Sequence, residues 1–220
     1  NHEFIKSPAQ LINHICPYCS NSKVGYGNDL ETNYPRITKQ WHPTKNKTLT
    51  PDMVLPLSNK KVWWKCPVAD DHEWDTAIWN RTSKKTGCPI CSGHKIVLSN
   101  SIEITHPGIA KQWHPTKNKK ISIREIGIGS GKKAWWKCPV ADDHEWKAVI
   151  NTRKKSGCSI CVNKKVVKSN CLKTTHPKIA KTFHKTKNGK YTTENIHAGS
   201  GILLWWKCPV ADDHEWQAKP

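Results

Sequence analysis

The sequence predicts a tandem array of small α+β modules, each built from a short helix and a β-hairpin and stabilised by a metal ion. Two observations lead to this fold class: a set of three cysteines and one histidine recurs along the chain, and the last cysteine of one set lies 47 positions before the first cysteine of the next. The pairs separated by this interval are Cys19 and Cys66, Cys91 and Cys138, and Cys161 and Cys208. A constant interval of this length indicates repeated supersecondary units.

The metal ligands are best defined in the two complete modules. They are Cys66, His72, Cys88 and Cys91 in the first, and Cys138, His144, Cys158 and Cys161 in the second. Three thiolates and one imidazole form a closed tetrahedral ligand set for Zn²⁺, which leaves no position for a substrate water. We therefore predict one structural zinc ion in each complete module, and we expect a chelator to unfold it.

Incomplete ligand sets occur near both ends of the chain. They are His2, Cys16 and Cys19 at the N-terminus, and Cys208 with His214 at the C-terminus. A closed zinc site needs four ligands, so the first set requires one outside ligand and the second requires two. We expect a piece of a longer protein, with the end of an upstream unit at residues 1–20, complete units at 30–93 and 101–163, and the start of a third unit at 171–220.

Composition agrees with modules that need a metal. The chain has 220 residues, of which 36% are hydrophobic, and modules of roughly 60 to 70 residues have marginal cores. A chain with ten cysteines could be a secreted disulfide scaffold. However, Cys-x2-Cys pairs with a histidine between them favour zinc and a reducing, intracellular compartment. Cys171 lies outside the pattern, and we interpret it as a small buried or free thiol. Because no apolar run has the length of a membrane span and the first residues show no signal peptide, we expect no membrane partner.

The predicted elements follow one another in the same order in each unit. A proline early in the segment and apolar residues four apart predict one short helix at residues 34–42, 105–113 and 175–183, with Thr105 and Thr175 as N-caps. Polar loops then lead into a strand that carries a Trp-Trp pair. The alternation from His72 to Ile78 predicts the next strand. The stretch from His72 to Cys88 is two residues longer than its counterpart in the next unit, which indicates a hairpin of adjustable length.

These motifs together resemble a known family. They are Trp-His-Pro-x-Lys-Asn at 41–46, Trp-Trp-x-Cys at 63–66, His-Glu-Trp at 72–74, Arg81, and Gly-Cys-Pro-x-Cys at 87–91, and they return over residues 113–161. They resemble the zinc-ribbon (treble-clef-like) domain that occurs in tandem copies in bacterial and large-DNA-virus proteins, sometimes beside nuclease-like domains. The resemblance covers nearly the whole chain and implies the zinc scaffold. Ser159, Phe183 and Lys185 depart from the pattern.

The tryptophans allow two interpretations. They could stack on unpaired bases, or they could fill the cores of modules that have few leucines and phenylalanines. Because strand residues alternate between two faces, one member of each Trp-Trp pair is expected to point inward. We interpret Trp64 and Trp74 as core residues, and Trp63 as the better candidate for a contact with a partner.

The basic residues also allow two interpretations. The formal net charge is +19, which favours a polyanionic partner, nucleic acid above all. The candidate nucleic-acid-binding residues are Lys60, Lys61, Trp63, Arg81, Lys84, Lys85, Lys132, Lys133, Arg153, Lys154 and Lys155. Their recurrence at matching places could form a stripe along a phosphate backbone, whereas lysine runs on loops are often solvated faces.

The run Asp70-Asp71-His72-Glu73 raises the possibility of catalysis, because carboxylates and histidines transfer protons. However, His72 is needed as a zinc ligand, and a ligating imidazole is not a free general base. We interpret the acidic pair as shaping the turn or as accepting a hydrogen bond from a ligand. We predict no catalytic residue and no enzymatic activity.

Two functions stay open at this point. In the first, the array binds DNA or RNA largely without sequence specificity, with a steep salt dependence. In the second, the modules are structural and hold protein partners together in a large assembly such as a large-DNA-virus particle, where the positive charge meets acidic protein surfaces. In either case, further zinc units of the same longer chain or assembly are expected neighbours. Convergence of the basic side chains on one face would favour the first function.

Overall fold

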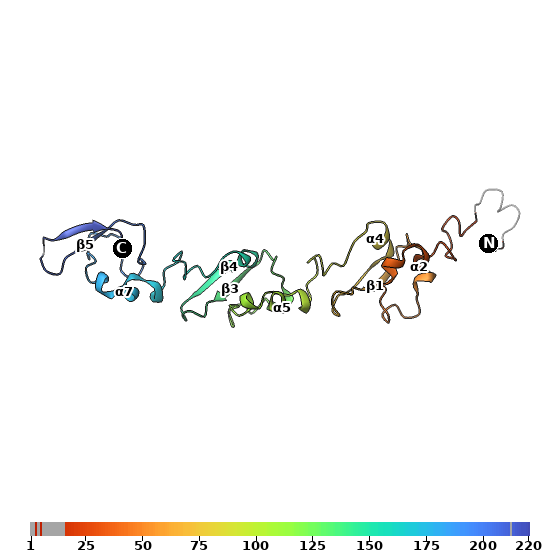
Figure 1. Cartoon of the computed structure of the whole chain (residues 1–220), viewed down its shortest axis with the longest axis horizontal. Coiled ribbons are helices and arrows are strands. Elements are labelled where there is room, and N and C mark those ends of the chain that lie inside the picture. Colours follow the sequence, from red (N-terminus) through yellow and green to blue (C-terminus); the bar gives the residue numbers. More distant parts are fainter. Residues whose placement is uncertain (1–2, 4, 6–15, 212) are drawn as a thin grey trace. The chain divides into compact units, whose positions relative to one another are not determined.

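The computed structural model describes residues 3, 5, 16–211 and 213–220, and within these residues one set of elements forms three times (Figure 1). The centre of each set is a two-stranded antiparallel hairpin. The hairpins are β1 (Lys61–Lys65) with β2 (Glu73–Ala77), β3 (Lys133–Lys137) with β4 (Glu145–Val149), and β5 (Leu204–Lys207) with β6 (Glu215–Ala218). The small α+β modules that the sequence predicts are therefore present.

Two short helices precede each hairpin, where the sequence predicts one. The pairs are α2 (Leu30–Asn33) and α3 (Pro35–Thr38), α5 (Ile102–Thr105) and α6 (Pro107–Ala110), and α7 (Leu172–Thr175) and α8 (Pro177–Ala180). Proline lies in the first turn of α3, α6 and α8, as predicted. The predicted N-caps are wrong: Thr105 and Thr175 end the preceding helices, and the caps are His106 and His176, which make no capping bond with their side chains.

A further helical turn follows the second strand. It is the α-helix α4 (Ile78–Thr82) in the first complete module and the 3-10 helix η4 (Ile150–Lys154) in the second. The other 3-10 turns are η1 (Pro51–Met53), η2 (Leu98–Asn100), η3 (Ile123–Glu125) and η5 (Lys168–Asn170). The two extra residues of the first module thus lie beyond its second strand. The prediction of a hairpin of adjustable length is wrong, because the hairpin register is the same in both modules.

The strands divide each hairpin into an inner and an outer face. Val62 and Trp64 are buried and point into the core, whereas Trp63 between them is half-buried on the outer face. Trp64 lies directly opposite Trp74 on the neighbouring strand, and both side chains are buried. The prediction that Trp64 and Trp74 are core residues is confirmed.

A ring from the segment after the second helix completes the core. Trp41 meets Trp64 edge to face, with 5.5 Å between ring centroids. The same contact is formed at 5.3 Å between Trp113 and Trp136 and at 5.6 Å between Phe183 and Trp206. Edge-to-face packing is a favoured geometry for aromatic rings. The substitution of phenylalanine at residue 183 therefore keeps the contact.

The chain forms two compact units, Asn1–Ile104 and Thr105–Pro220. The predicted module limits at 30–93, 101–163 and 171–220 each enclose one hairpin and the helices that precede it. In the part of the chain that the structure describes, no helix has the length and apolar character needed to cross a membrane.

We expect truncation of the inner tryptophan to destabilise its own module strongly. Trp64→Ala removes a fully buried ring and should cost about 3 to 5 kcal/mol, whereas Trp63→Ala, on the outer face, should cost less than about 1 kcal/mol. Hydrogen exchange of the zinc-loaded chain, followed by mass spectrometry, reports the two effects on the β1–β2 amides. Equal loss of protection in both variants would contradict the assignment of faces.

Candidate metal centres

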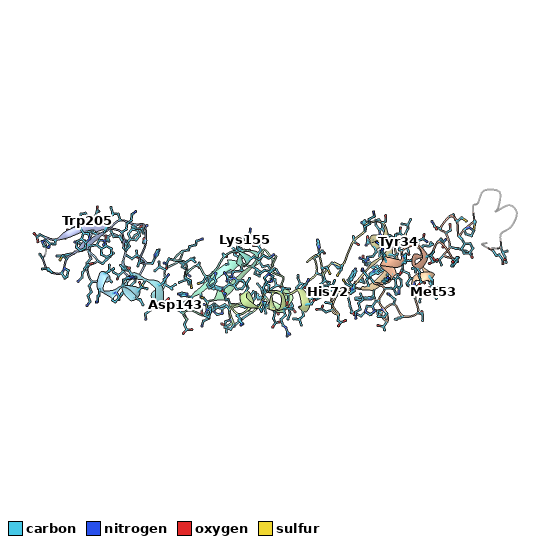
Figure 2. The ribbon with its side chains drawn as sticks, viewed as in Figure 1. Tyr34, Met53, His72, Asp143, Lys155 and Trp205 are labelled. Atoms are coloured by element: carbon cyan, nitrogen blue, oxygen red, sulfur yellow. The ribbon has the colours of Figure 1, made fainter. Side chains whose placement is uncertain are left out.

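The hairpin places the first two ligands of each site. Cys66 directly follows β1 and His72 directly precedes β2, and the backbone N–H of Cys66 donates to the carbonyl of His72 at 2.9 Å. The connection between the two strands is therefore a closed turn with one ligand at each end. His72 is labelled in Figure 2. The other two ligands, Cys88 and Cys91, lie on a turn that follows α4.

The four ligand atoms of the first module have the separations that a zinc ion requires. The Sγ atoms of Cys66 and Cys91 are 3.7 Å apart. His72 Nδ1 lies 3.3 Å from Cys91 Sγ and 3.8 Å from Cys88 Sγ, and all four ligand atoms lie within 4.8 Å of one another. For a tetrahedral zinc ion, ordinary bond lengths imply about 3.8 Å between two sulfurs and about 3.5 Å between sulfur and nitrogen. The donor set therefore fits zinc bound through Nδ1.

The second module repeats this geometry with the ligands Cys138, His144, Cys158 and Cys161. The Sγ atoms of Cys138 and Cys161 are 3.7 Å apart, and His144 Nδ1 lies 3.3 Å from Cys161 Sγ and 3.8 Å from Cys158 Sγ. The structure thus brings together the four predicted ligands of each of these two sets. Within the described residues, these are the two groups of cysteine, histidine or carboxylate side chains that are close enough to hold a metal ion.

The cysteines of these sites are thiols held together, and they are not disulfides. A separation of 3.7 Å between sulfurs is far longer than a disulfide bond of about 2.05 Å. Desolvation of its sulfur, together with the neighbouring Cys66 and Cys88, raises the pKa of Cys91 to about 12. The same causes raise the pKa of Cys161 to about 12. A pKa this high opposes loss of the thiol proton at neutral pH. A divalent cation overcomes that opposition, because it stabilises all three thiolates.

A serine from the segment after the Cys-x2-Cys turn orients the histidine ligand. With Nδ1 turned to the metal site, His72 Nε2 lies 3.1 Å from the hydroxyl of Ser99, and the backbone N–H of Ser99 donates to Asp71 at 2.9 Å. Hydrogen bonds from Ser99 lower the pKa of Asp71. Asp71 is therefore a carboxylate that fixes the serine, which in turn fixes the tautomer of the zinc ligand.

The second module has the same arrangement, and the sequence analysis missed both serines. His144 Nε2 lies 3.0 Å from the hydroxyl of Ser169, and the backbone of Ser169 donates to Asp143 at 2.8 Å. A signal was available, because a Ser-Asn pair follows the last cysteine by eight positions in both modules. The asparagines of these pairs hold the metal-binding turn, since Asn100 and Asn170 donate to the carbonyls of Ile90 and Ile160 inside the Cys-x2-Cys turns.

The remaining members of the acidic run also have structural partners. Asp70 is exposed and pairs with Lys65 at 3.2 Å. Glu73 accepts from Nε2 of the buried His42 at 3.0 Å and pairs with Lys45. Hydrogen bonds from Lys45 and His42 hold the pKa of Glu73 at about 2. Each carboxylate of the run is thus engaged in holding the turn or the hairpin.

The histidine of the Trp-His-Pro-x-Lys-Asn motif acts as a loop organiser. His42 Nδ1 accepts from the backbone N–H groups of Thr44 and Lys45, at 3.2 and 3.1 Å. Because Nδ1 is an acceptor, the hydrogen of the neutral ring is on Nε2, which donates to Glu73. His114 with Glu145 and His184 with Glu215 form the same bonds. These three histidines are therefore buried structural groups.

Arg81 and Arg153 require a correction. The sequence analysis placed them on an exposed basic face, but the structure buries them, with 6% and 5% of their surfaces exposed. Arg81 donates to the side chain of Gln40 at 2.5 Å and to the carbonyl of Thr86 at 2.6 Å. Its guanidinium also lies 5.2 Å from the ring centroid of Trp64. A lone sequence cannot show that this charge faces inward.

The buried arginine lies beside the thiolates. Burial lowers the pKa of Arg81, and the negative charges of Cys88 and Cys66 oppose that shift. Arg81 lines the same cleft as the three cysteine ligands, and its Nε has no hydrogen-bond partner in the described part of the chain. Zinc with three thiolates and one neutral imidazole carries a net charge of −1. We interpret Arg81, and Arg153 in the second module, as the cation that balances this charge.

The other predicted binding residues lie at the surface. The exposed lysines are Lys60, Lys61, Lys84, Lys85, Lys132, Lys133, Lys154 and Lys155. Lys155 is labelled in Figure 2. Trp63 is half-buried, and the ammonium of Lys45 lies 4.5 Å from its ring centroid. The predicted stripe is therefore reduced to lysines and an outer tryptophan, without the arginines.

The incomplete set at the N-terminus is described only in part. His2 lies outside the described residues. Cys16 and Cys19 lie on a turn in which Ser20 N–H donates to the Cys16 carbonyl at 2.9 Å, as Ser92 N–H does to that of Cys88 at 3.2 Å. The turn is thus of the same kind as in the complete site. That it holds zinc with an outside ligand stays a prediction.

The incomplete set at the C-terminus shares one backbone hydrogen bond with the complete sites. Cys208 N–H donates to the His214 carbonyl at 2.9 Å, while 62% of the His214 side chain is exposed. That this pair holds zinc with two outside ligands also stays a prediction. Cys171, the cysteine outside the pattern, is 1% exposed, which agrees with its interpretation as a buried thiol.

Comparison with known families agrees with this description. The model of a family described as "Probable Treble clef zinc finger domain" matches residues 37–94, 109–164 and 179–220. Each match begins within the second short helix, and the first two matches end just after the Cys-x2-Cys turn. No curated protein matches the chain.

We expect loss of the buried arginine to weaken zinc binding at one site only. Arg81→Met keeps an unbranched apolar stem but removes the guanidinium charge beside the thiolates, and substitutions around metal ligands typically lower metal affinity by about 10- to 100-fold. Competition with a chromogenic chelator should therefore show one weakened site, and Arg153→Met should weaken the other.

Lys85→Met is the matched control, because it removes one positive charge from the same cleft at an exposed position. It should leave both affinities unchanged. Equal effects of Arg81→Met and Lys85→Met would show that Arg81 has no special relation to the thiolates.

Proposed function

Because the chain belongs to the family of probable treble clef zinc finger domains, we propose that its tandem zinc modules bind nucleic acid, largely without sequence specificity. The zinc sites shape the modules, and the outer faces of the hairpins make the contacts. DNA and RNA both offer the regular row of phosphates that this surface suits.

The charge of the chain supports a polyanionic partner. The sequence has 36 lysines and arginines against 17 aspartates and glutamates. Each complete zinc site lowers the net charge by only one, which leaves a large positive excess. Such an excess attracts nucleic acid and raises the rate of association.

The observation that carries the proposal is a repeated pair of tryptophan and lysine on the outer face of each hairpin. The ammonium groups of Lys45, Lys117 and Lys187 lie 4.5, 4.8 and 4.8 Å from the ring centroids of Trp63, Trp135 and Trp205. These rings are half-buried, whereas their strand neighbours fill the core. These ammonium groups pair with Glu73, Glu145 and Glu215, so each ring is the part of the pair that can stack on a base. Other exposed lysines then meet the phosphates.

The site chemistry favours binding over catalysis. Four protein ligands close each complete metal site, which leaves no open coordination position of the kind that catalytic zinc uses. The nearby carboxylates Asp71 and Glu73 are hydrogen-bonded to Ser99 and to His42 with Lys45. We therefore propose no enzymatic role.

One repeated feature favours the alternative, a structural role in a large assembly such as a virus particle. Val68, Val140 and Val210 lie at the tips of the three turns between strands, and they are 70%, 70% and 86% exposed. Exposed apolar side chains are common singly, but their recurrence at one position suits contacts with a protein. In this alternative, acidic protein surfaces meet the lysines.

We expect binding to DNA to fall steeply with salt and to depend on the hairpin-flanking lysines. Each phosphate contact on duplex DNA adds about 0.9 to the slope of log affinity against log salt. Changing Lys84, Lys85, Lys154 and Lys155 to Gln should therefore flatten the slope, by up to about 3.6 if all four contact phosphates. Fluorescence anisotropy of the zinc-loaded chain on labelled duplex, over a range of salt concentrations, measures it.

A matched control removes four exposed lysines that lie in or next to the short helices that precede the hairpins, α3, α6 and α8. These are Lys39, Lys111, Lys178 and Lys181. Their replacement by Gln should change the slope less, although the net charge falls equally. Absent binding to DNA and RNA, or equal slopes in the two quadruple variants, would favour the assembly alternative.

A further inference from the structure

The second module carries a basic groove that includes its outer tryptophan. The groove has a volume of about 740 Å³ and lies between the loop at residues 116–121 and the outer face of β3 and β4. Its lining includes Lys133, Trp135 and Lys147 from the strands. The sequence analysis predicted Lys133 as a binding residue, but it did not single out the loop lysines or Lys147.

Hydrogen bonds fix the loop that forms one wall of the groove. His114 Nδ1 accepts from the backbone N–H groups of Thr116 and Lys117, each at 3.2 Å. Asn118 then clamps the loop to the strand: its side chain donates to the Trp135 carbonyl and accepts from the Trp135 N–H, each at 2.9 Å. The groove is therefore preorganised, which lowers the entropy cost of binding a ligand.

The groove is strongly positive. Its lining holds five lysines: Lys117, Lys119, Lys120, Lys133 and Lys147. Lys117 pairs with Glu145. The other four are exposed, and among the described residues no carboxylate lies within ion-pair distance of them. Their charges are therefore available to an anionic ligand.

The tryptophan gives the groove an aromatic surface among these charges. Trp135 is half-buried and lies opposite Lys147 on the neighbouring strand. The ammonium of Lys117 is 4.8 Å from its ring centroid. A ligand with flat rings and regularly spaced negative charges would engage the tryptophan and the lysines together.

Comparison of the three modules shows that this charge is particular to the second. In the first module, Thr48 stands where the second has Lys120, and Asp75 lies opposite Trp63 where Lys147 lies opposite Trp135. In the third, Gly189 replaces Lys119, Leu203 replaces Lys133 and Gln217 lies opposite Trp205. The hairpin and its tryptophan are shared, whereas the row of lysines is not.

We propose that the groove of the second module is a binding site for single-stranded nucleic acid, with Trp135 stacking on an unpaired base and the free lysines contacting phosphates. This inference rests on the proposed function and assigns it to one module. In a duplex, the faces of the bases are stacked against one another, so the tryptophan would gain nothing there. An acidic peptide would use the lysines but would leave the ring without a stacking partner.

The first test compares two tryptophans at the same position of two modules. Trp135→Ala should weaken binding of the zinc-loaded chain to a labelled oligothymidylate by about tenfold, since stacking on aromatic side chains has effects of this size. Trp63→Ala, the comparison variant, should weaken it by a clearly smaller factor, because Asp75 lies opposite Trp63 and repels phosphates. Binding to a duplex of the same length should be nearly indifferent to both substitutions.

The second test exchanges the residues opposite these tryptophans. Lys147→Asp places opposite Trp135 the residue that the first module has opposite Trp63, and it should weaken binding of the oligothymidylate. Asp75→Lys gives the first module the charge of the second, and it should strengthen binding. Both positions are exposed strand residues, so the fold should tolerate the exchange, which zinc content and hydrogen exchange of the hairpins can verify.

The outcomes separate this inference from the function on which it rests. If the chain binds no nucleic acid at all, the proposed function fails. If it binds but Trp135→Ala and Trp63→Ala have equal effects, the proposed function stands and the groove assignment is wrong. If polyglutamate displaces the oligothymidylate as efficiently as unlabelled oligothymidylate does, and Trp135→Ala has no effect, the groove is a site for acidic protein surfaces.

Discussion

Zinc ligation joins two parts of each module that are distant in the sequence, the turn of the hairpin and the Cys-x2-Cys turn. The backbone of the hairpin holds Cys66 and His72 together, but three desolvated thiols form a stable set only around a cation. Two further residues support this site. Arg81 lies beside the thiolates, and the hydroxyl of Ser99 contacts the imidazole of His72. The small aromatic core then packs against an anchored hairpin.

Because zinc ligation and the inner face hold each module together, the side chains on the outer face of the hairpin can differ between modules. The inner positions are restricted, because Trp64 and Trp74 must fill the core opposite each other. The outer positions carry no such restriction, and they hold Asp75, Lys147 or Gln217 opposite the same tryptophan. The scaffold is therefore shared, whereas the binding properties that we propose vary with the outer side chains.

The zinc ligands and the faces of the strands could be predicted, because ligand spacing and a period of two residues are local patterns. The paired helices could not, since helices of four residues, such as α2 and α5, are too short to show a helical period. Arg81 was misplaced because a sequence does not show whether a charge faces solvent or a thiolate. Ser99 was missed because serine is not itself a zinc ligand, and its hydrogen bond to His72 becomes visible only in the folded chain. The groove could not be predicted, because it is formed by a loop and two strands whose relative positions the sequence does not give.

X-ray absorption at the zinc edge tests the central claim, that each complete module is organised around a closed metal site. We expect the zinc-loaded protein to bind at least two zinc ions, each with three sulfurs at about 2.3 Å and one nitrogen at about 2.0 Å, and without a water ligand. Cys91→Ser and Cys161→Ser should each abolish one such site. An average shell richer in oxygen or nitrogen than in sulfur, or folded modules that hold no zinc, would contradict the claim.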